Sequence, residues 1–179
     1  MAIETISEGL PQIVKSTELD FEELRRFRSF GVPELLLTNE NFFEDKFVKF
    51  VELIGANIIG DPKIVKFDGE FTGFTGVAVI GASSVTAHTY LEKGQRLDLT
   101  VETCTKLPYL DIAPSIIYDL FGNPEKIQEV IYNTPDIEDM ERELNYPFAF
   151  RNAGLALAKS NLYVNGVLVS EKNPRNECS

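Results

Sequence analysis

Three β-type segments follow one another in the middle of the chain, separated only by short joins. The first, residues 76–81, is a continuous apolar run that suits a buried strand, and the second, 84–91, is rich in β-branched and aromatic residues. In the third, 95–104, apolar and polar residues alternate, which is typical of a strand with one face in the core. Because a parallel pair needs a long crossover, joins this short indicate antiparallel pairing. We therefore expect an antiparallel sheet.

Helix patterns surround these strands. The clearest covers residues 40–54, where phenylalanine, valine and isoleucine recur at helical spacing and Gly55 supplies a stop. Cap signals, proline positions and composition predict further helices over 16–28, 114–121, 124–133 and 136–145. Short β-type runs lie at 56–60 and 63–67, and a two-residue hairpin is expected at Asn165-Gly166. Helices on one face of a mainly antiparallel sheet give a two-layer α/β (α+β) sandwich.

The length of the chain predicts a single domain. The 179 residues suffice for one full hydrophobic core, and we expect one domain over 1–179, with 173–179 as a disordered tail. The first residues carry no basic segment followed by an apolar run, and no apolar stretch approaches the roughly 20 residues that cross a bilayer. A cytoplasmic protein without membrane contact is therefore expected.

Charge and cysteine content exclude several classes of function. The net charge of −11 argues against nucleic acid as a partner, because phosphates would be repelled. It is compatible with a cationic ligand, although solubility alone accounts for such a charge. The cysteines, Cys104 and Cys178, lie far apart and outside any CxxC pair, and the chain has one histidine. Neither a metal site nor a disulfide framework is expected, and a reducing compartment fits.

A series of short motifs lies between residues 74 and 104. They are Thr75-Gly76-Val77, Ala82-Ser83-Ser84, His88-Thr89-Tyr90-Leu91-Glu92, and Asp98 through Thr103-Cys104. Taken singly, a serine pair is most often a turn, and a lone histidine on a strand is most often structural. Their order and spacing resemble those of the short prokaryotic S-adenosylmethionine decarboxylases, which depend on a pyruvoyl group. The resemblance extends over roughly residues 33–133.

The resemblance implies that the chain makes its own prosthetic group. In this family a serine hydroxyl attacks the preceding carbonyl, the chain is cleaved, and a covalent pyruvoyl group remains at the new N-terminus. That group captures the substrate amine as a Schiff base and accepts the electrons released as carbon dioxide departs. Ser83 would be its precursor, with cleavage after Ala82. His88 would remove a proton during the elimination, and Thr75 stands where a hydroxyl residue assists self-cleavage.

The same resemblance assigns roles toward the substrate. Cys104 would return a proton to the substrate α-carbon after decarboxylation. Glu92 would accept hydrogen bonds from the ribose hydroxyls. Phe67 or Phe71 lies near the position of the adenine-stacking aromatic residue, although the local spacing differs. A small-molecule substrate and a homo-oligomer are implied, because the family assembles as dimers with sites near the subunit interface.

The chain departs from the family pattern near the reacting serine. Ala82 stands where the family usually has an acid, Ser84 where short prokaryotic members usually have histidine, and Leu91 where a proline is usual. One additional residue lies between His88 and Cys104, which predicts a bulge or a longer turn.

These departures leave three functions open. The first is self-processing decarboxylation of S-adenosylmethionine for polyamine synthesis. The second keeps the pyruvoyl chemistry with arginine or ornithine as substrate, which Glu92 disfavours because these amino acids have no ribose. The third is an unprocessed homologue that regulates an active partner, which the presence of Ser83, His88 and Cys104 together disfavours.

Overall fold

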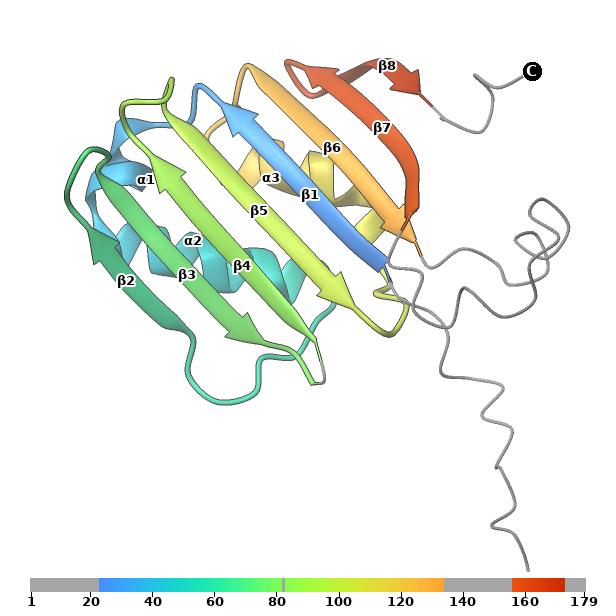
Figure 1. The fold of residues 1–179 in the computed structure, drawn as a ribbon, viewed down its shortest axis with the longest axis horizontal. Coiled ribbons are helices and arrows are strands. Elements are labelled where there is room, and N and C mark those ends of the chain that lie inside the picture. Colours follow the sequence, from blue (N-terminus) through green and yellow to red (C-terminus); the bar gives the residue numbers. More distant parts are fainter. Residues whose placement is uncertain (1–22, 82, 134–155, 173–179) are drawn as a thin grey trace, which may run out of the picture.

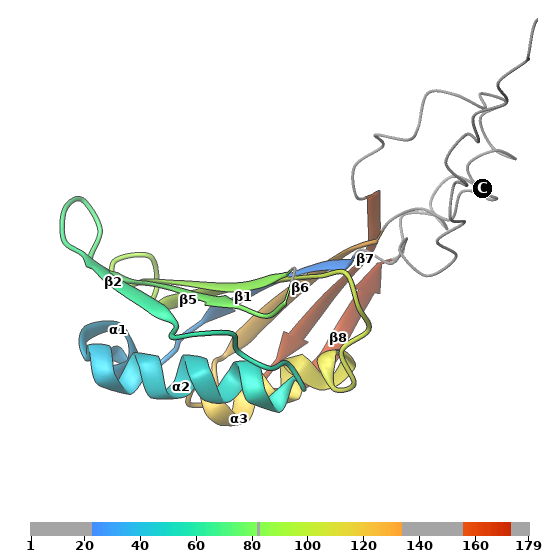
Figure 2. The same cartoon turned by 90° about the horizontal axis from the view of Figure 1, so that it is seen from below.

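The computed structural model describes residues 23–81, 83–133 and 156–172. Within them, eight strands form one antiparallel sheet, and all the helices pack against one of its faces (Figures 1 and 2). The predicted two-layer α/β sandwich is confirmed. The face opposite the helices is called the open face below.

The strands lie in the sheet in the order β2-β3-β4-β5-β1-β6-β7-β8. Their bounds are β1 Glu23–Phe30, β2 Lys63–Phe67, β3 Gly73–Val79, β4 Ser84–Tyr90, β5 Arg96–Thr103, β6 Lys126–Asn133, β7 Ala156–Val164 and β8 Val167–Lys172. The helices are α1 Glu34–Thr38, α2 Glu40–Leu53, the short 3-10 helix η1 Leu110–Ile112 and α3 Ala113–Leu120. The first strand in sequence thus lies in the middle of the sheet, between β5 and β6 (Figure 1).

The helix predicted at 40–54 is α2, and its aromatic stripe builds the core. The Asn39 side chain accepts a hydrogen bond from the Phe42 amide and so caps the N-terminus. Phe43 and Phe47 are fully buried, and the Phe43 ring stacks on that of Phe74 in β3 at 5.5 Å. A Cβ at Gly76 would lie only 3.1 Å from the Phe47 ring, so the missing side chain lets α2 approach the sheet closely.

Two predicted helices are strands in the structure. Residues 23–28, the end of the helix expected over 16–28, belong to β1, and 126–133 of the helix expected over 124–133 form β6. Both segments contain good helix formers. β1 has a pairing partner on each side, and β6 bonds to both β1 and β7, so backbone pairing outweighs local propensity. The buried Arg25 fits the core face of β1 because it pairs with Glu23 and Glu129.

The other predicted elements have mixed outcomes. Strands are found at 63–67, 84–90 and 96–103, the helix expected over 114–121 is α3, and Asn165-Gly166 joins β7 to β8 with φ of 47° and 76°. The run 56–60 is not a strand; it is tied to the sheet by the bond from the Ile59 amide to the Val79 carbonyl (2.8 Å). Residues 136–145 and 173–179, for which a helix and a tail are predicted, lie outside the described residues.

Strand β3 differs from the continuous buried run that its sequence suggests. Phe74, Gly76 and Ala78 are buried against the helices, whereas Val77 and Val79 lie on the open face with 36% and 47% of their surface exposed. An apolar strip therefore runs along this part of the open face. In the described part of the chain, every helix is too short or too polar to cross a membrane.

Candidate active site

Ser83 and Cys104 meet at one end of the sheet. Strand β4 begins directly after Ser83, β5 ends directly before Cys104, and the two strands pair with Ser84 opposite Glu102. The Ser83 hydroxyl donates to the Cys104 sulfur at 3.4 Å and accepts a hydrogen bond from the Cys104 amide at 3.1 Å. Both side chains are half-buried. The structure thus brings together the predicted pyruvoyl precursor and the predicted proton donor.

The turn before Ser83 is a tight hairpin. The Ile80 amide donates to the Ser83 carbonyl at 2.9 Å, and Gly81 has a φ of 81°, a conformation that glycine adopts without strain. Ala82, the predicted residue before the cleaved bond, lies outside the described residues. The turn positions the serine hydroxyl at the start of β4, beside the end of β5.

Thr75 and His88 form a second pair on the open face. They lie opposite each other on β3 and β4, and the Thr75 hydroxyl is 3.0 Å from His88 Nδ1. This contact fixes the orientation of the imidazole ring and leaves Nε2 for another partner.

The Ser83–Cys104 pair and the Thr75–His88 pair do not meet within one chain. His88 lies four positions beyond Ser84 on the same strand, and at about 3.3 Å per residue their Cα atoms are roughly 13 Å apart. His88 lies on the open face, because Ser84, Thr86, His88 and Tyr90 alternate with the buried Val85, Ala87 and Thr89. Cys104 comes two residues after Glu102, which pairs with Ser84 on that face.

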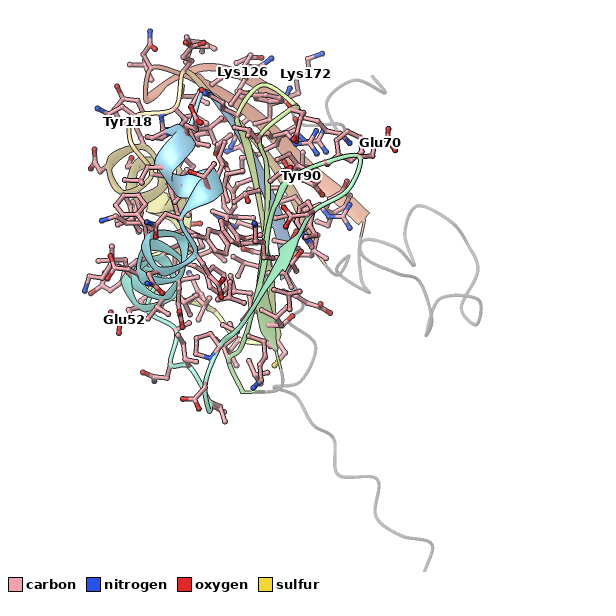
Figure 3. The ribbon with its side chains drawn as sticks, turned by 90° about the vertical axis from the view of Figure 1, so that its left-hand side faces the viewer. Glu52, Glu70, Tyr90, Tyr118, Lys126 and Lys172 are labelled. Carbon is pink, nitrogen blue, oxygen red and sulfur yellow. The ribbon has the colours of Figure 1, made fainter. Side chains whose placement is uncertain are left out.

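Aromatic rings cluster beyond His88. Phe67 and Phe71 both pack against Tyr90, with ring centroids 6.0 and 6.5 Å away, and the His88 ring is 6.5 Å from Tyr90. Figure 3 labels Tyr90 at the open face of the sheet, across from the helix-side residues Glu52 and Tyr118. Tyr90 was not predicted as a site residue, although its place two residues after His88 on a strand puts both side chains on one face.

Glu92 holds the loop that carries Phe71. Its Oε2 accepts a hydrogen bond from the Thr72 amide at 2.9 Å, and this bond lowers the pKa of the exposed carboxyl below its ordinary value. An exposed carboxylate thus lies next to the loop that carries Phe71. Lys93 lies 3.8 Å above the Phe71 ring, a cation–π contact.

The additional residue between His88 and Cys104 is taken up in a turn. The register of β4 with β5 runs without interruption from Ser84–Glu102 to Tyr90–Arg96, so neither strand bulges. The five residues 91–95 connect the strands, with positive φ at Gly94 and Gln95. The sequence predicted either a bulge or a longer turn, and the structure has the longer turn.

A comparison with known protein families identifies a match for the middle of the chain. The model of the S-adenosylmethionine decarboxylase family matches residues 29–122, which span the chain from the end of β1 to the residue after Phe121. This region includes every predicted site residue. No curated protein sequence matches the chain.

Proposed function

The chain belongs to the S-adenosylmethionine decarboxylase family, and from this premise we propose that it is a pyruvoyl-dependent decarboxylase acting on S-adenosylmethionine. The observation that carries the proposal is the contact of the Ser83 hydroxyl with the amide and thiol of Cys104. Decarboxylated S-adenosylmethionine would then supply polyamine synthesis, including that of spermidine.

Self-processing at Ser83 is the first part of the proposal. The Ser83 Oγ attacks the Ala82 carbonyl carbon, and the peptide C–N bond breaks to give an ester and a free amine. Removal of the Ser83 Cα proton, the task proposed for His88, expels the upstream chain as a carboxylate. Water then hydrolyses the dehydroalanine that remains at residue 83. Its nitrogen leaves as ammonia, and a pyruvoyl group is left at the new N-terminus. The hydrogen bond from the Cys104 amide supports this step, because it holds the hydroxyl in a fixed position.

The surroundings of Ser83 fit a small acyl group. The position is half-buried at a strand end, with an amide donor 3.1 Å and a thiol 3.4 Å from the side-chain oxygen. A pyruvoyl group there supplies a carbonyl that binds the substrate amine and withdraws the electrons released with carbon dioxide. We assign to the Cys104 thiol the return of a proton to the substrate α-carbon.

The aromatic cluster is proposed as the nucleoside subsite. Phe67 or Phe71 would stack on adenine, and Glu92, held in place by its bond from the Thr72 amide, would accept hydrogen bonds from the ribose. Lys93 covers the Phe71 ring in the free protein, so binding there would require this side chain to move.

We further propose that two copies of the chain form each site. The distance of about 13 Å between the Cα atoms of Ser84 and His88 keeps the imidazole of one copy from its own Ser83. A second copy packed on the open face would bring its Thr75–His88 pair to that serine. The exposed Val65, Val77 and Val79 give this face an apolar strip that suits such packing.

Intact-mass spectrometry of the freshly purified protein tests self-processing. The wild type is expected as two fragments, with the downstream one beginning at a blocked residue 83, and Ser83→Ala as one unbroken chain. Ser84→Ala, which removes the neighbouring hydroxyl, is the matched control and should process normally. One unmodified mass for the wild type would contradict the proposal and favour the unprocessed regulatory homologue.

The substrate needs a separate measurement. Carbon dioxide release should be compared with S-adenosylmethionine, arginine and ornithine in parallel, on protein already shown to be cleaved. The ionised Glu92 beside the aromatic rings favours S-adenosylmethionine, because arginine and ornithine have neither a ribose nor an adenine. Release from arginine or ornithine alone would reassign the substrate and leave the pyruvoyl chemistry in place.

A further inference from the structure

Thr103 belongs to the motif that ends in Cys104, yet the reaction proposed above gives its side chain no role. It is the last residue of β5, and 2% of its surface is exposed. Buried and open-face residues alternate along this strand, so the Thr103 side chain shares the helix side with Leu99 and Val101. It therefore lies behind the contact between Ser83 and Cys104.

The Thr103 hydroxyl closes a turn around Cys104. Its Oγ1 atom donates to the Thr105 carbonyl at 2.6 Å and accepts a hydrogen bond from the Thr105 amide at 3.1 Å. A hydroxyl that bonds the backbone two residues onward takes the place of a turn made by backbone groups alone. Both the donor and the acceptor capacity of this buried hydroxyl are thus used within the turn.

This turn restrains the two backbone torsions of Cys104. The bond from the Thr105 amide to the Thr103 hydroxyl closes a ring through the covalent bonds of residues 103–105, and the Cys104 nitrogen and Cα atoms belong to that ring. Rotation about either torsion would stretch or break the bond. A side chain on the helix side of the sheet therefore sets the direction of the Cys104 amide and of its Cα–Cβ bond.

The restrained amide is the group that donates to the Ser83 hydroxyl, at 3.1 Å. Cys104 lies beyond the last residue pairs of β5 with β4 and β1, so neither ladder fixes this amide. Among the residues that the structure describes, the next hydrogen bond that ties the following segment to another element is that from the Tyr109 amide to the Ile54 carbonyl, at 3.4 Å. The Thr103 hydroxyl is thus the nearest restraint on Cys104.

We propose that Thr103 is a positioning residue for self-cleavage, whose hydroxyl directs the Cys104 amide toward Ser83 Oγ and so keeps the attacking oxygen in place. The inference rests on the proposed self-processing at Ser83. It adds a requirement that this proposal does not contain, because the hydroxyl of Thr103 never touches the reacting atoms. Loss of that hydroxyl should slow cleavage, since a small misplacement of an attacking group lowers a reaction rate strongly.

Thr103→Val tests the role, because valine keeps the branched shape and lacks the hydroxyl. Labelled full-length chains are made in a brief pulse of cell-free synthesis, and the cleaved fraction is followed over time. Thr103→Val should cleave about tenfold more slowly than the wild type, whereas Thr103→Ser, which keeps the hydroxyl, should stay within about threefold. Thr103→Ser and Thr103→Ala differ by the hydroxyl alone and repeat the comparison in a smaller side chain.

Thr38→Val is the matched control. The Thr38 hydroxyl also donates to a backbone carbonyl, that of Glu34 at 2.9 Å. It lies in α1, which follows the bond from the Gly31 amide to the Gly94 carbonyl, at the opposite end of β4 from Ser83. Its loss should leave the cleavage rate unchanged. Urea midpoints, measured for each variant in an uncleaved Ser83→Ala chain, report stability separately.

The inference is overturned if Thr103→Val cleaves as fast as the wild type, or if Thr103→Ser is as slow as Thr103→Val, since shape alone would then matter. It is also overturned if the cleavage rates simply follow the urea midpoints, because the residue would then only support the fold. A wild type that never cleaves would refute the proposed self-processing together with this inference. A cleaved wild type with an equally fast Thr103→Val would refute the inference alone.

Discussion

At the scale of single residues, the contact between Ser83 and Cys104 separates two steps of the proposed reaction. The Cys104 backbone amide donates to the Ser83 hydroxyl, which in turn donates to the thiol, and only the thiol has a proposed role toward the substrate. A change of the side chain should therefore affect turnover more than self-cleavage.

Cys104→Ala is expected to cleave itself within a few-fold of the wild-type rate and to lose about 10²- to 10⁴-fold in turnover, the usual contribution of a proton donor. Cleavage is followed by intact mass and turnover by carbon dioxide release. Cys178→Ala removes the other cysteine of the sequence and is the control. If Cys104→Ala turned over at the wild-type rate, the thiol would have no part in the chemistry.

The resemblance to the family named Ser83 and Cys104, and the uninterrupted register of β4 with β5 brings the two residues together. The strand predicted over 84–91 already separates His88 from Ser83 in the same chain, because its residues advance about 3.3 Å each.

At the scale of elements, the packing of α2 on β3 depends on a missing side chain. A methyl group at Gly76 would lie 3.1 Å from the Phe47 ring, in a core where that ring is fully buried. Overpacking of this kind typically costs about 1–3 kcal/mol.

Gly76→Ala is therefore expected to lower the free energy of unfolding by about 1–3 kcal/mol, measured by urea denaturation. Gly69→Ala is the matched control, because a Cβ there would meet no atom within 4 Å and its φ is not in the left-handed region. Equal stability of Gly76→Ala and the wild type would show that α2 can shift without cost.

The pairing of β6 with β7 contains a titratable contact. The Tyr163 hydroxyl donates to Glu129 Oε2 at 3.1 Å, and burial, followed by the charge of Glu129, raises the pKa of Tyr163 to about 12. In the unfolded chain its pKa is about 10. The stabilisation is thus complete below pH 10 and is lost as the pH rises toward 12.

Urea midpoints measured from pH 9 to 11.5 should fall more steeply for the wild type than for Tyr163→Phe. Tyr109→Phe is the control, since Tyr109 is 54% exposed and should leave the slope unchanged. Parallel curves for the wild type and Tyr163→Phe would contradict the assignment.

The elements themselves were predicted unevenly. The phenylalanine stripe of α2 and the alternation of β5 identify their structures without tertiary information. The segments of β1 and β6 do not, because their charged and polar residues favour a helix locally. Glu129 is tolerated on the buried face of β6 only through Arg25, Asn161 and Tyr163.

At the scale of the whole molecule, the proposed two-copy site predicts complementation. In a mixed dimer of Ser83→Ala and His88→Ala chains, the first supplies an intact His88 and the second an intact Ser83.

His88→Ala expressed alone should remain largely uncleaved, and its co-expression with Ser83→Ala should restore cleavage of the His88→Ala chain. Tagged chains of different mass allow both to be followed by mass spectrometry. Co-expression with the double variant Ser83→Ala/His88→Ala is the control and should restore nothing. Equal cleavage of His88→Ala in every mixture would place the site within one copy.

The position of β1 has a consequence for a chain that cuts itself after residue 82. The upstream piece would contain β1, β2 and β3, and the downstream piece β4 to β8. Three ladders would then join the pieces, β3 to β4 and β1 to both β5 and β6, with β1 wedged between two strands of the other piece. Maturation would turn one polypeptide into two interlocked ones, which share one hydrophobic core without a covalent link between them, and neither could depart without opening the middle of the sheet.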